Sequence, residues 1–260
     1  MPKLSAVITT FNNASTLRRC LQSLQRSGEL FVDEVLVLDS GSSDQTVQIA
    51  RQFGARIETQ PFVDYGSQKQ QAINLACHDW ILLLDADEWL AESLQLSIAQ
   101  WRSHGNGGVI AYRLKRQEWI LWRWQHRWSK AVSPIRLFNR QHARMNKVPV
   151  HAAITAQGST ATMQGYLRHT GEASLHRKVD KINAYSSGQA KWRQTRGLLR
   201  FRMLVYPLFA FWREYLLRRQ FLHGWAGFMA AKSASFYAFL KYAKAFEAQK
   251  NKAGNPDQLE

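Results

Sequence analysis

Short apolar segments alternate with segments of helical periodicity through the first hundred residues of this chain. The β-type segments are Leu4–Thr9, Glu34–Leu38, Ala55–Thr59 and Trp80–Leu84. The segments with apolar residues at helical spacing are Leu17–Leu24, Val47–Phe53, Gly66–Ala76 and Leu90–Trp101. The second and fourth β-type segments are apolar almost throughout, as is typical of parallel strands covered on both faces. The pattern predicts an α/β fold made of repeated βα units.

Polar residues follow three of the β-type segments. They are Thr9-Thr10, Asp39-Ser40 and Asp85-Ala86-Asp87. In open parallel sheets, ligands bind at the edge where the carboxyl ends of the strands meet. We therefore expect these polar groups, which come from three separate strands, to lie at one edge of the sheet and to form a binding site.

The sequence Asp85-Ala86-Asp87-Glu88 has the most direct chemical meaning. Two carboxylates in one turn suit Mg²⁺ or Mn²⁺, which take oxygen ligands and add the phosphates of a substrate. The alternative interpretation is that Asp87 and Glu88 only cap the following helix. Phosphatases of the haloacid dehalogenase type carry an Asp-x-Asp pair on their first strand. Here the pair follows the fourth, so a phosphohydrolase is not expected.

Two further polar segments fit a nucleotide site. Asp39, at a strand end, can accept hydrogen bonds from a base or a ribose, although ordinary turn chemistry also explains it. Lys69, in a predicted helix, can meet a phosphate, although a solvated lysine is the plain alternative. Neither GxGxxG nor GxxxxGK[ST] occurs in the chain, so the usual dinucleotide and P-loop motifs are missing.

The composition changes beyond Gly108, and we predict three regions. Val109–Lys115, Pro134–Phe138 and Val148–Thr155 have β character, and a Trp-rich stretch from Gln117 to Trp128 has apolar residues that can partly share a helical face. Residues 174–250 have helical composition, with breaks expected at Pro207 and Gly224. The predicted regions are a catalytic domain at 1–172 (halves 1–105 and 106–172), a basic helical region at 173–252 and a disordered tail at 253–260.

Positive charge is concentrated in the last third of the chain. The chain carries 35 Lys and Arg against 19 Asp and Glu, and residues 174–252 alone hold 16 against 3. Basic helices rich in aromatic residues are typical of proteins that lie on anionic membranes, and no segment reaches the roughly 18 apolar residues of a spanning helix. The alternative is a solvated helix pair that packs on the catalytic domain. Nucleic acid would explain the charge, but not Asp39, Lys69 and Asp-x-Asp, and no nucleic-acid motif is present.

Two cysteines, Cys20 and Cys77, are too few for a disulfide framework or a thiolate zinc site. We expect both to be buried packing residues in a protein of a reducing compartment.

Four sequences in order resemble the motifs of the family-2 glycosyltransferases, which have the GT-A fold. They are ITTFNN from Ile8, VLDSGSSDQT from Val37, GSQKQQAIN from Gly66 and DWILLLDADEWL from Asp79. More narrowly, RLFNR at 136–140, VPVHAAI at 148–154 and the C-terminal stretch 206–244 resemble the bacterial lipopolysaccharide core glucosyltransferases. These enzymes add a β-1,4-linked glucose to a heptose of the inner core. The resemblance implies a mixed sheet flanked by helices.

The resemblance also implies the roles of individual residues in binding UDP-glucose. Thr9 and Phe11 would line the uracil pocket, Phe11 by stacking, and Asp39 would accept a hydrogen bond from the uracil ring. Lys69 would lie close to the nucleotide. Asp85 would contact ribose or a metal-bound water, and Asp87 would ligate a Mg²⁺ or Mn²⁺ ion that bridges the diphosphate.

The chain departs from the family pattern where relatives read Val-His-Glu, because it has Val150-His151-Ala152. An inverting transfer needs a base that takes the proton from the acceptor hydroxyl. If the missing glutamate is that base, the remaining candidates are His151, Glu88 and Glu118. A chain without the base would instead be an impaired GT-A scaffold that binds a membrane surface or nucleic acid.

Taken together, the sequence predicts a metal-dependent, inverting hexosyltransferase. It would move glucose from UDP-glucose to a heptose of the lipid-anchored inner core of lipopolysaccharide. We expect it to be a peripheral protein on the cytoplasmic face of the inner membrane.

Overall fold

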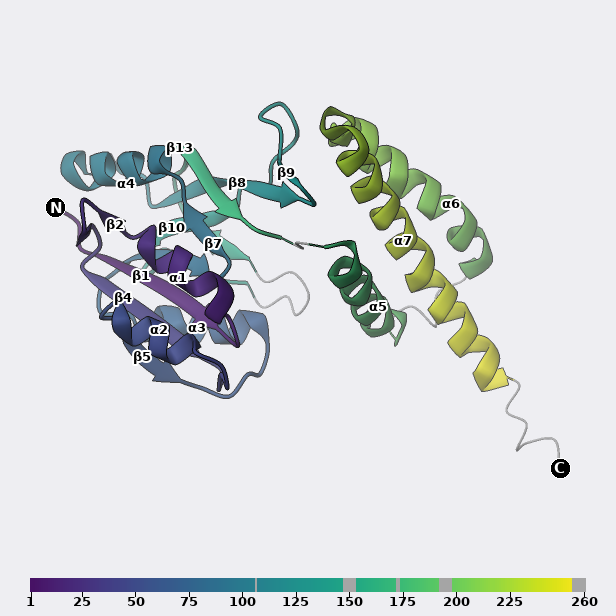
Figure 1. Cartoon of the computed structure of the whole chain (residues 1–260), viewed down its shortest axis with the longest axis horizontal. Coiled ribbons are helices and arrows are strands. Elements are labelled where there is room, and N and C mark those ends of the chain that lie inside the picture. Colours follow the sequence, from purple (N-terminus) through teal and green to yellow (C-terminus); the bar gives the residue numbers. More distant parts are fainter. Residues whose placement is uncertain (106, 147–152, 172–173, 192–197, 254–260) are drawn as a thin grey trace. The chain divides into compact units, whose positions relative to one another are not determined.

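The computed structural model of the chain describes residues 1–105, 107–146, 153–171, 174–191 and 198–253 (Figure 1). They form two compact units. The first unit comprises Met1–Gln117 and Ala131–Thr170, and the second comprises Glu118–Lys130 and Gly171–Glu260. The predicted division at residue 172 had assigned residues 118–130 to the first region. The predicted tail lies outside the described residues except for Ala253, the last residue of a helix.

The described elements of the first unit follow the predicted alternation of strand and helix. In chain order they are β1 (Leu4–Thr10), α1 (Ala14–Gln22), β2 (Gln25–Arg26), β3 (Glu29–Leu30), β4 (Glu34–Asp39), α2 (Thr46–Gln52), β5 (Arg56–Thr59), α3 (Tyr65–Leu75), β6 (Trp80–Asp85), β7 (Glu88–Leu90), α4 (Glu92–His104), β8 (Ala111–Ile120), β10 (Ile135–Asn139), β11 (Ala143–Met145), β12 (Ile154–Ala156) and β13 (Thr160–His169). Strand β8 continues past Gln117 into the second unit.

The main sheet is mixed, as expected. Among the described residues its strand order is β5-β4-β1-β6-β10-β8-β13-β7. The four strands predicted first, β1, β4, β5 and β6, pair in parallel. Strand β10 then runs antiparallel to both β6 and β8, and β13 runs antiparallel to β7. The predicted α/β fold with a mixed sheet flanked by helices is confirmed.

Both faces of the central strands are buried, which explains their apolar sequences. Ala6 and Ile8 of β1 join a core with α1, α2 and α4, whereas Val7 between them joins a second core with α3. Side chains alternate between the faces of a strand, so a strand covered on both sides must be apolar at successive positions. Burial of both faces therefore explains the apolar sequences of these strands. Their parallel pairing places the carboxyl ends of the strands at one edge of the sheet.

Five described strands of the first unit were not anticipated: β2, β3, β7, β11 and β13. Leu90 does not begin a helix as predicted but ends the short strand β7, and α4 begins at Glu92. Strand β13 alternates apolar and polar residues too weakly to be recognised, although Met163 and Leu167 are buried. Pairing with β7 over residues 167–169 stabilises β13, and this long-range contact leaves no local signal.

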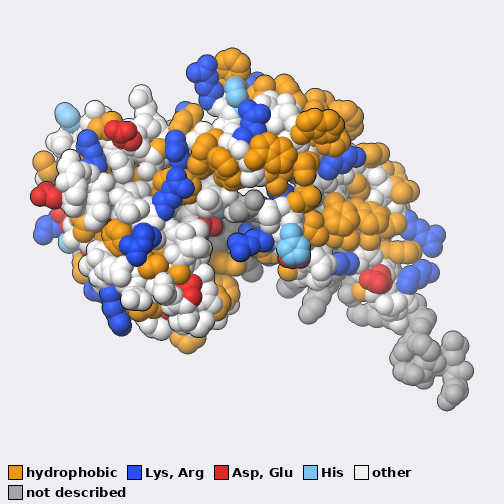
Figure 2. Space-filling model, viewed as in Figure 1, with side chains coloured by type: hydrophobic (Ala, Val, Ile, Leu, Met, Phe, Trp, Pro, Cys, Tyr) orange, Lys and Arg blue, Asp and Glu red, His pale blue; other side chains and the backbone are white. Residues whose placement is uncertain are grey.

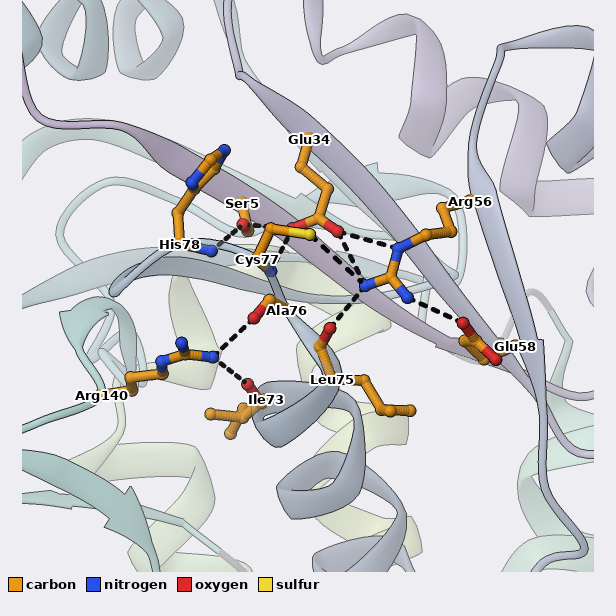
Figure 3. A network of polar contacts seen from close by, with 10 residues as sticks. All are labelled: Ser5, Glu34, Arg56, Glu58, Ile73, Leu75, Ala76, Cys77, His78 and Arg140. Atoms are coloured by element: carbon orange, nitrogen blue, oxygen red, sulfur yellow. Dashed lines mark hydrogen bonds and ion pairs between the residues drawn. The ribbon is translucent and has the colours of Figure 1, made fainter.

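A network of polar contacts joins β1, β4, β5 and the loop after α3 at the amino ends of the strands (Figure 3). Glu34 is its centre. Its carboxylate accepts hydrogen bonds from the Ser5 hydroxyl and the Cys77 N–H, and it pairs with the Arg56 guanidinium at 2.8 Å. Burial alone would raise the pKa of Glu34, but these donors lower it to about 2 from an ordinary value of 4.5. The network ties β5 and the end of α3 to the middle of the sheet.

Replacing Glu34 with Gln is expected to remove a pH-dependent part of the stability. Because the pKa of Glu34 is depressed in the folded state, its contribution is fully present above about pH 4.5 and is lost as the pH falls toward about 2. The contribution is at most about 3 kcal/mol, because Arg56 is partly exposed. Urea unfolding of the wild type and of Glu34→Gln over this pH range measures the contribution as a difference in the free energy of unfolding. This difference should become smaller as the pH falls.

Glu58→Gln is the matched control for Glu34→Gln. Glu58 pairs with the same guanidinium at 2.7 Å, but its side chain is 41% exposed. Exposed ion pairs contribute about 0–1 kcal/mol, so this variant should differ little from the wild type at any pH. Equal effects of the two substitutions would contradict the central role of Glu34.

The second unit consists of helices and one hairpin. Its described elements are the end of β8, β9 (Arg123–Trp124), α5 (Leu175–Lys191), α6 (Leu199–Trp212), the π-helical turn η1 (Arg213–Leu217), the 3-10 turn η2 (Gln220–His223) and α7 (Gly224–Ala253). The helical face considered for the Trp-rich stretch is wrong. Trp119 of β8 and Trp124 of β9 are paired across a hairpin, with their rings 5.0 Å apart.

The hairpin belongs to the helical unit because hydrogen bonds join the two. The His126 N–H donates to Nε2 of the buried His223 at 2.8 Å, and the Lys130 N–H donates to the Arg218 carbonyl at 3.3 Å. These contacts join residues almost a hundred positions apart. The local sequence therefore could not reveal them.

One of the two predicted helix breaks is wrong and the other is confirmed. Helix α6 continues through Pro207, although proline removes one backbone hydrogen bond. Packing against α7 stabilises this helix: the Tyr206 and Tyr242 rings lie 5.1 Å apart, and Leu199 is buried with Tyr242 and Ala245. Gly224, with φ of 54°, begins α7 after the η2 turn, in a conformation that favours glycine.

Among the described residues, no helix combines the length and the apolar character needed to cross a bilayer.

Candidate active site

The carboxyl ends of the central strands bring the predicted polar residues to one edge of the sheet. In the parallel registers, Thr10 of β1 lies opposite Asp39 of β4, and Thr9 lies opposite Asp85 of β6. The expectation that three strand ends meet at one edge is therefore confirmed. What each side chain binds there is a separate question, which depends on its contacts.

Asp39 organises the loop that follows β4. Its buried carboxylate accepts hydrogen bonds from the Thr10 hydroxyl at 2.9 Å and from the N–H groups of Gly41 and Ser42 at 2.9 and 2.7 Å. The Ser42 hydroxyl donates as well. Gly41 has φ of 90°, which suits glycine and lets the loop fold back onto the carboxylate. The loop is thus fixed before any ligand binds.

The loop after β1 is held against this loop and presents an aromatic ring. The Asn12 side-chain oxygen accepts from the Ser43 N–H at 2.9 Å, and the Asn12 N–H donates to the Ser42 hydroxyl at 2.8 Å. Phe11, next to Asn12, is 57% exposed at this edge, whereas Thr9 is half-buried. An exposed ring beside a fixed polar loop can stack on a planar base. Asn12 is a supporting residue that the sequence prediction missed.

Asp85 lies between two cations. Lys69 of α3 forms an ion pair with one of its carboxylate oxygens, and Arg136 of β10 donates to the other at 2.7 Å. Burial alone would raise the pKa of Asp85, but the charges of Arg136 and Lys69 hold it well below its usual range. Asp85 is therefore ionised at neutral pH, and Lys69 is fixed at the strand edge rather than solvated.

Glu88 is fully buried and is bound on both carboxylate oxygens. One oxygen accepts from Arg136 at 2.8 Å and lies 3.5 Å from a guanidinium nitrogen of Arg116, while the other accepts from the Asp85 N–H at 3.0 Å. One guanidinium nitrogen of Arg136 thus holds Asp85 and Glu88 together. This environment favours a structural role for Glu88 over that of a base, because an acceptor hydroxyl would have to displace these partners.

Asp87 is the more accessible carboxylate of the pair. Its side chain is 39% exposed, and one oxygen lies 3.2 Å from Nε2 of His169, the last residue of β13. Burial raises and the His169 contact lowers the pKa of Asp87, with a net decrease from its ordinary value. The sequence prediction missed His169 because it missed β13.

The donor set at Asp87 fits a divalent cation. A carboxylate oxygen and an imidazole nitrogen so close together are both ligands for Mn²⁺, and carboxylates also suit Mg²⁺. Two protein ligands leave positions for phosphate oxygens and water, which these ions usually retain. Asp85 is less suited to direct ligation, because both of its oxygens already pair with cations.

The three predicted candidates for the base come from different parts of the chain. Glu88 is buried in the first unit, whereas Glu118 belongs to the second unit. His151, and Ala152 beside it, lie outside the described residues. The base remains a prediction with these three candidates.

Cys20 lies beneath the site, and Cys77 lies at the opposite edge of the sheet. The Cys20 thiol is buried, 3.8 Å from the Asp85 carbonyl, and burial and the nearby carboxylates raise its pKa. Cys77 is exposed, so the prediction that both cysteines are buried is wrong. It follows Ala76, where α3 has ended and the chain turns at the surface before β6.

One thiol per native chain, that of Cys77, is expected to react with Ellman's reagent. The reaction should be slow, because Glu34 raises the pKa of Cys77 and keeps the thiolate fraction low. The time course of absorbance, followed on the wild type and Cys77→Ser, measures this. Native Cys77→Ser should not react until denaturant exposes Cys20, and fast modification of two thiols in the native wild type would contradict the assignment.

The residues at this edge of the sheet also lie within a region that matches a known protein family. The sequence profile described as "Glycosyl transferase family 2" matches residues 5–169, more than half of the chain and every residue of the edge described above. The chain belongs to glycosyl transferase family 2. The match ends at His169, so it includes the residue that contacts Asp87.

Relatives of this family-2 glycosyltransferase cover nearly its whole length. A glycosyltransferase of Rickettsia felis is 32% identical over 95% of this chain and 91% of its own. The lipopolysaccharide core biosynthesis glycosyltransferase LpsC of Rhizobium meliloti is 27% identical over 97% and 96%. These alignments extend beyond the family-2 match into the sequence of the helical unit.

Among solved structures, glucosyl-3-phosphoglycerate synthase from Mycobacterium tuberculosis in complex with Mn²⁺, UDP and glucosyl-3-phosphoglycerate is similar over part of the chain. The match covers 45% of this chain and 44% of the synthase, with 24% identity and a TM-score of 0.35.

Proposed function

We propose that this family-2 glycosyltransferase transfers a hexose, glucose from UDP-glucose, to a heptose of the lipopolysaccharide inner core with inversion at the anomeric carbon. The observation that carries the proposal is the arrangement at the sheet edge. A fixed polar loop at Asp39, an exposed ring at Phe11 and the Asp85–Asp87 pair come from three neighbouring strands. A pure binding scaffold has no need of carboxylates held in this way.

The uridine is proposed to bind at β1 and β4. Phe11 would stack on uracil, beside Thr9, and Asp39 would accept from the ring N–H. Each Asp39 oxygen already accepts two hydrogen bonds, one oxygen from the hydroxyls of Thr10 and Ser42 and the other from the N–H groups of Gly41 and Ser42. A carboxylate has about four acceptor sites, so uracil would have to displace one of these donors, and a hydroxyl can turn to another partner more easily than a backbone N–H.

The diphosphate is proposed to bind at the Asp85–Asp87 turn. Asp87 and His169 would hold Mg²⁺ or Mn²⁺, which neutralises the charge that develops on the departing UDP. Lys69 lies within reach of the same turn through its pairing with Asp85 and would contact the phosphates. Arg136 and Glu88 keep the turn in place while the leaving group departs.

The proposed acceptor is supported by the relationship to LpsC, whose described role is in lipopolysaccharide core biosynthesis. A heptose of the lipid-anchored core would be reached at the cytoplasmic face of the inner membrane. The basic helical region, with 16 Lys and Arg against 3 Asp and Glu over residues 174–252, supports peripheral attachment to that anionic surface.

The test is a transfer assay with two readouts. Binding of UDP and UDP-glucose is measured by calorimetry with Mn²⁺ and with EDTA. Transfer is measured with labelled UDP-glucose or UDP-galactose and a core lipopolysaccharide that ends in heptose. Metal-dependent UDP binding and preferential transfer of glucose are expected. Binding of UDP-glucose without transfer to the core lipopolysaccharide would contradict the proposed acceptor. Failure to bind any nucleotide sugar would favour the alternative of an impaired GT-A scaffold.

A further inference from the structure

An exposed apolar stripe runs along α6 of the second unit. Phe201, Leu204, Leu208, Trp212 and Leu216 follow one another at helical spacing, and all are exposed, Leu204 by 69% and Leu208 by 65%. The opposite side of α6 packs on α7 through Leu199 and Met203. The stripe is therefore a second apolar face, which stays exposed in the described part of this unit.

Helix α7 extends this stripe. Leu204 and Leu208 line a groove of about 410 Å³ together with Phe236 and Phe239 of α7 and Lys232. Trp225, at the start of α7, is 75% exposed. Figure 2 shows hydrophobic side chains gathered over these helices, with basic side chains beside them. We call the exposed apolar residues 201, 204, 208, 212 and 216 of α6 and η1, with 236 and 239 of α7, the α6 face.

The surroundings of the α6 face are cationic. Arg200, Arg213, Arg218 and Arg219 are exposed along α6 and the following turns. Glu214, the one acidic residue between positions 199 and 223, is buried and pairs with Arg213 at 2.8 Å and with Arg218 at 3.4 Å. It therefore does not present a negative charge at this surface, and the exposed charge is positive.

We propose that the α6 face lies in the headgroup region of a bilayer that contains anionic phospholipids, with its apolar side chains reaching the acyl boundary. Apolar residues with Trp on one face and Arg beside them are the composition of interfacial helices. A second copy of this chain is disfavoured, because it would bring one cationic surface against another. The inference rests on the proposed function in one respect only, which is that the α6 face would bring the protein to the bilayer that holds its lipid-anchored acceptor.

The experiment is co-sedimentation of the full-length protein with vesicles of phosphatidylcholine alone or with added phosphatidylglycerol. The wild type should bind the mixed vesicles and be released by salt. Leu204→Glu/Leu208→Glu should weaken this binding about tenfold or more, because two exposed leucines lose their apolar contact with lipid. Leu30→Glu/Leu96→Glu is the matched control, because both leucines are exposed in the first unit, by 42% and 41%.

Each other outcome contradicts the proposal. Absence of binding to phosphatidylglycerol vesicles overturns it, and an equal loss in the control pair shows that net charge alone is responsible. Sedimentation velocity that shows a dimer abolished by the Leu204 and Leu208 changes, with no vesicle binding, assigns the face to self-association. Circular dichroism checks folding, and Leu204→Gln/Leu208→Gln replaces the Glu pair if that pair unfolds.

UDP binding distinguishes failure of this inference from failure of the proposed function. The α6 variants keep the sheet edge of the first unit, so their metal-dependent UDP binding should equal that of the wild type. Loss of vesicle binding with normal UDP binding supports the α6 face. If the wild type binds UDP but no vesicles, the proposed transferase function still stands and the proposed membrane contact of the α6 face is wrong.

Discussion

Asp87→Asn is expected to weaken Mn²⁺-dependent binding of UDP by on the order of a hundredfold, with little change in stability. The substitution removes the negative charge of the most accessible carboxylate at the site and leaves a neutral amide oxygen, which is a weaker ligand for a divalent cation. Calorimetry with UDP in Mn²⁺ and in EDTA measures the effect. In EDTA, the wild type and the variant should bind equally weakly.

The control for Asp87→Asn is a carboxylate at the other end of the same strand. Asp79 directly precedes β6, its side chain is 51% exposed, and it pairs with Arg140 at 3.2 Å. Asp79→Asn removes the same charge from the chain but not from the proposed site, so UDP binding should not change. Equal losses in both variants would indicate a general effect of net charge and would contradict metal ligation by Asp87.

The three acidic groups at and just after the end of β6, those of Asp85, Asp87 and Glu88, are held differently, which indicates a division of roles. Asp85 and Glu88 are neutralised by Lys69, Arg136 and Arg116, so they can stay charged in a poorly solvated place without a metal. Asp87 has only the His169 contact among the ion pairs described. Of the three carboxylates, that of Asp87 is therefore the least neutralised by protein cations and the best suited to bind a metal ion.

The central sheet could be predicted because its signal is local. Residues 35–38 and 80–84 are apolar at successive positions, and such runs form strands that are buried on both faces. Once the strands are parallel, topology alone places Thr10, Asp39 and Asp85 at one edge. The strand pattern was therefore sufficient to predict where these residues, which are proposed to bind the nucleotide sugar, lie in the sheet.

The rest of the site depends on contacts between distant residues. Arg136 reaches Asp85 from a strand fifty residues later, and His169 reaches Asp87 from β13, whose pattern is weak. Nothing in the sequence near Arg136 distinguishes a buried arginine from a solvated one. Only the carboxylates that it meets, after β10 has paired with β6, fix its role. The same holds for the hairpin at 118–130, whose partners lie near residue 220.

Arg136→Met is expected to destabilise the protein by about 3–5 kcal/mol, because it leaves Glu88 and Asp85 charged without their shared guanidinium. Adding Glu88→Gln should restore part of the loss, since it removes a buried carboxylate that would keep only Arg116, at 3.5 Å, as its cationic partner. The destabilisation should shrink as the pH falls into the acid range, because Arg136 helps to keep the pKa of Asp85 low in the wild type, and that part of the stability is lost when Asp85 is protonated. Urea unfolding of the single and double variants measures all three effects.

Arg140→Met is the control for this interpretation, because Arg140 follows the same strand but is partly exposed and donates mainly to the carbonyls of Ile73 and Ala76. Its loss should cost about 1 kcal/mol at any pH. If Arg136→Met cost no more than Arg140→Met, or if Glu88→Gln added to its cost, Arg136 would not be what holds the two carboxylates in place. The Asp85–Asp87 turn would then owe its geometry to the backbone pairing of β6 with β1 and β10, and the donor site would tolerate changes at Arg136.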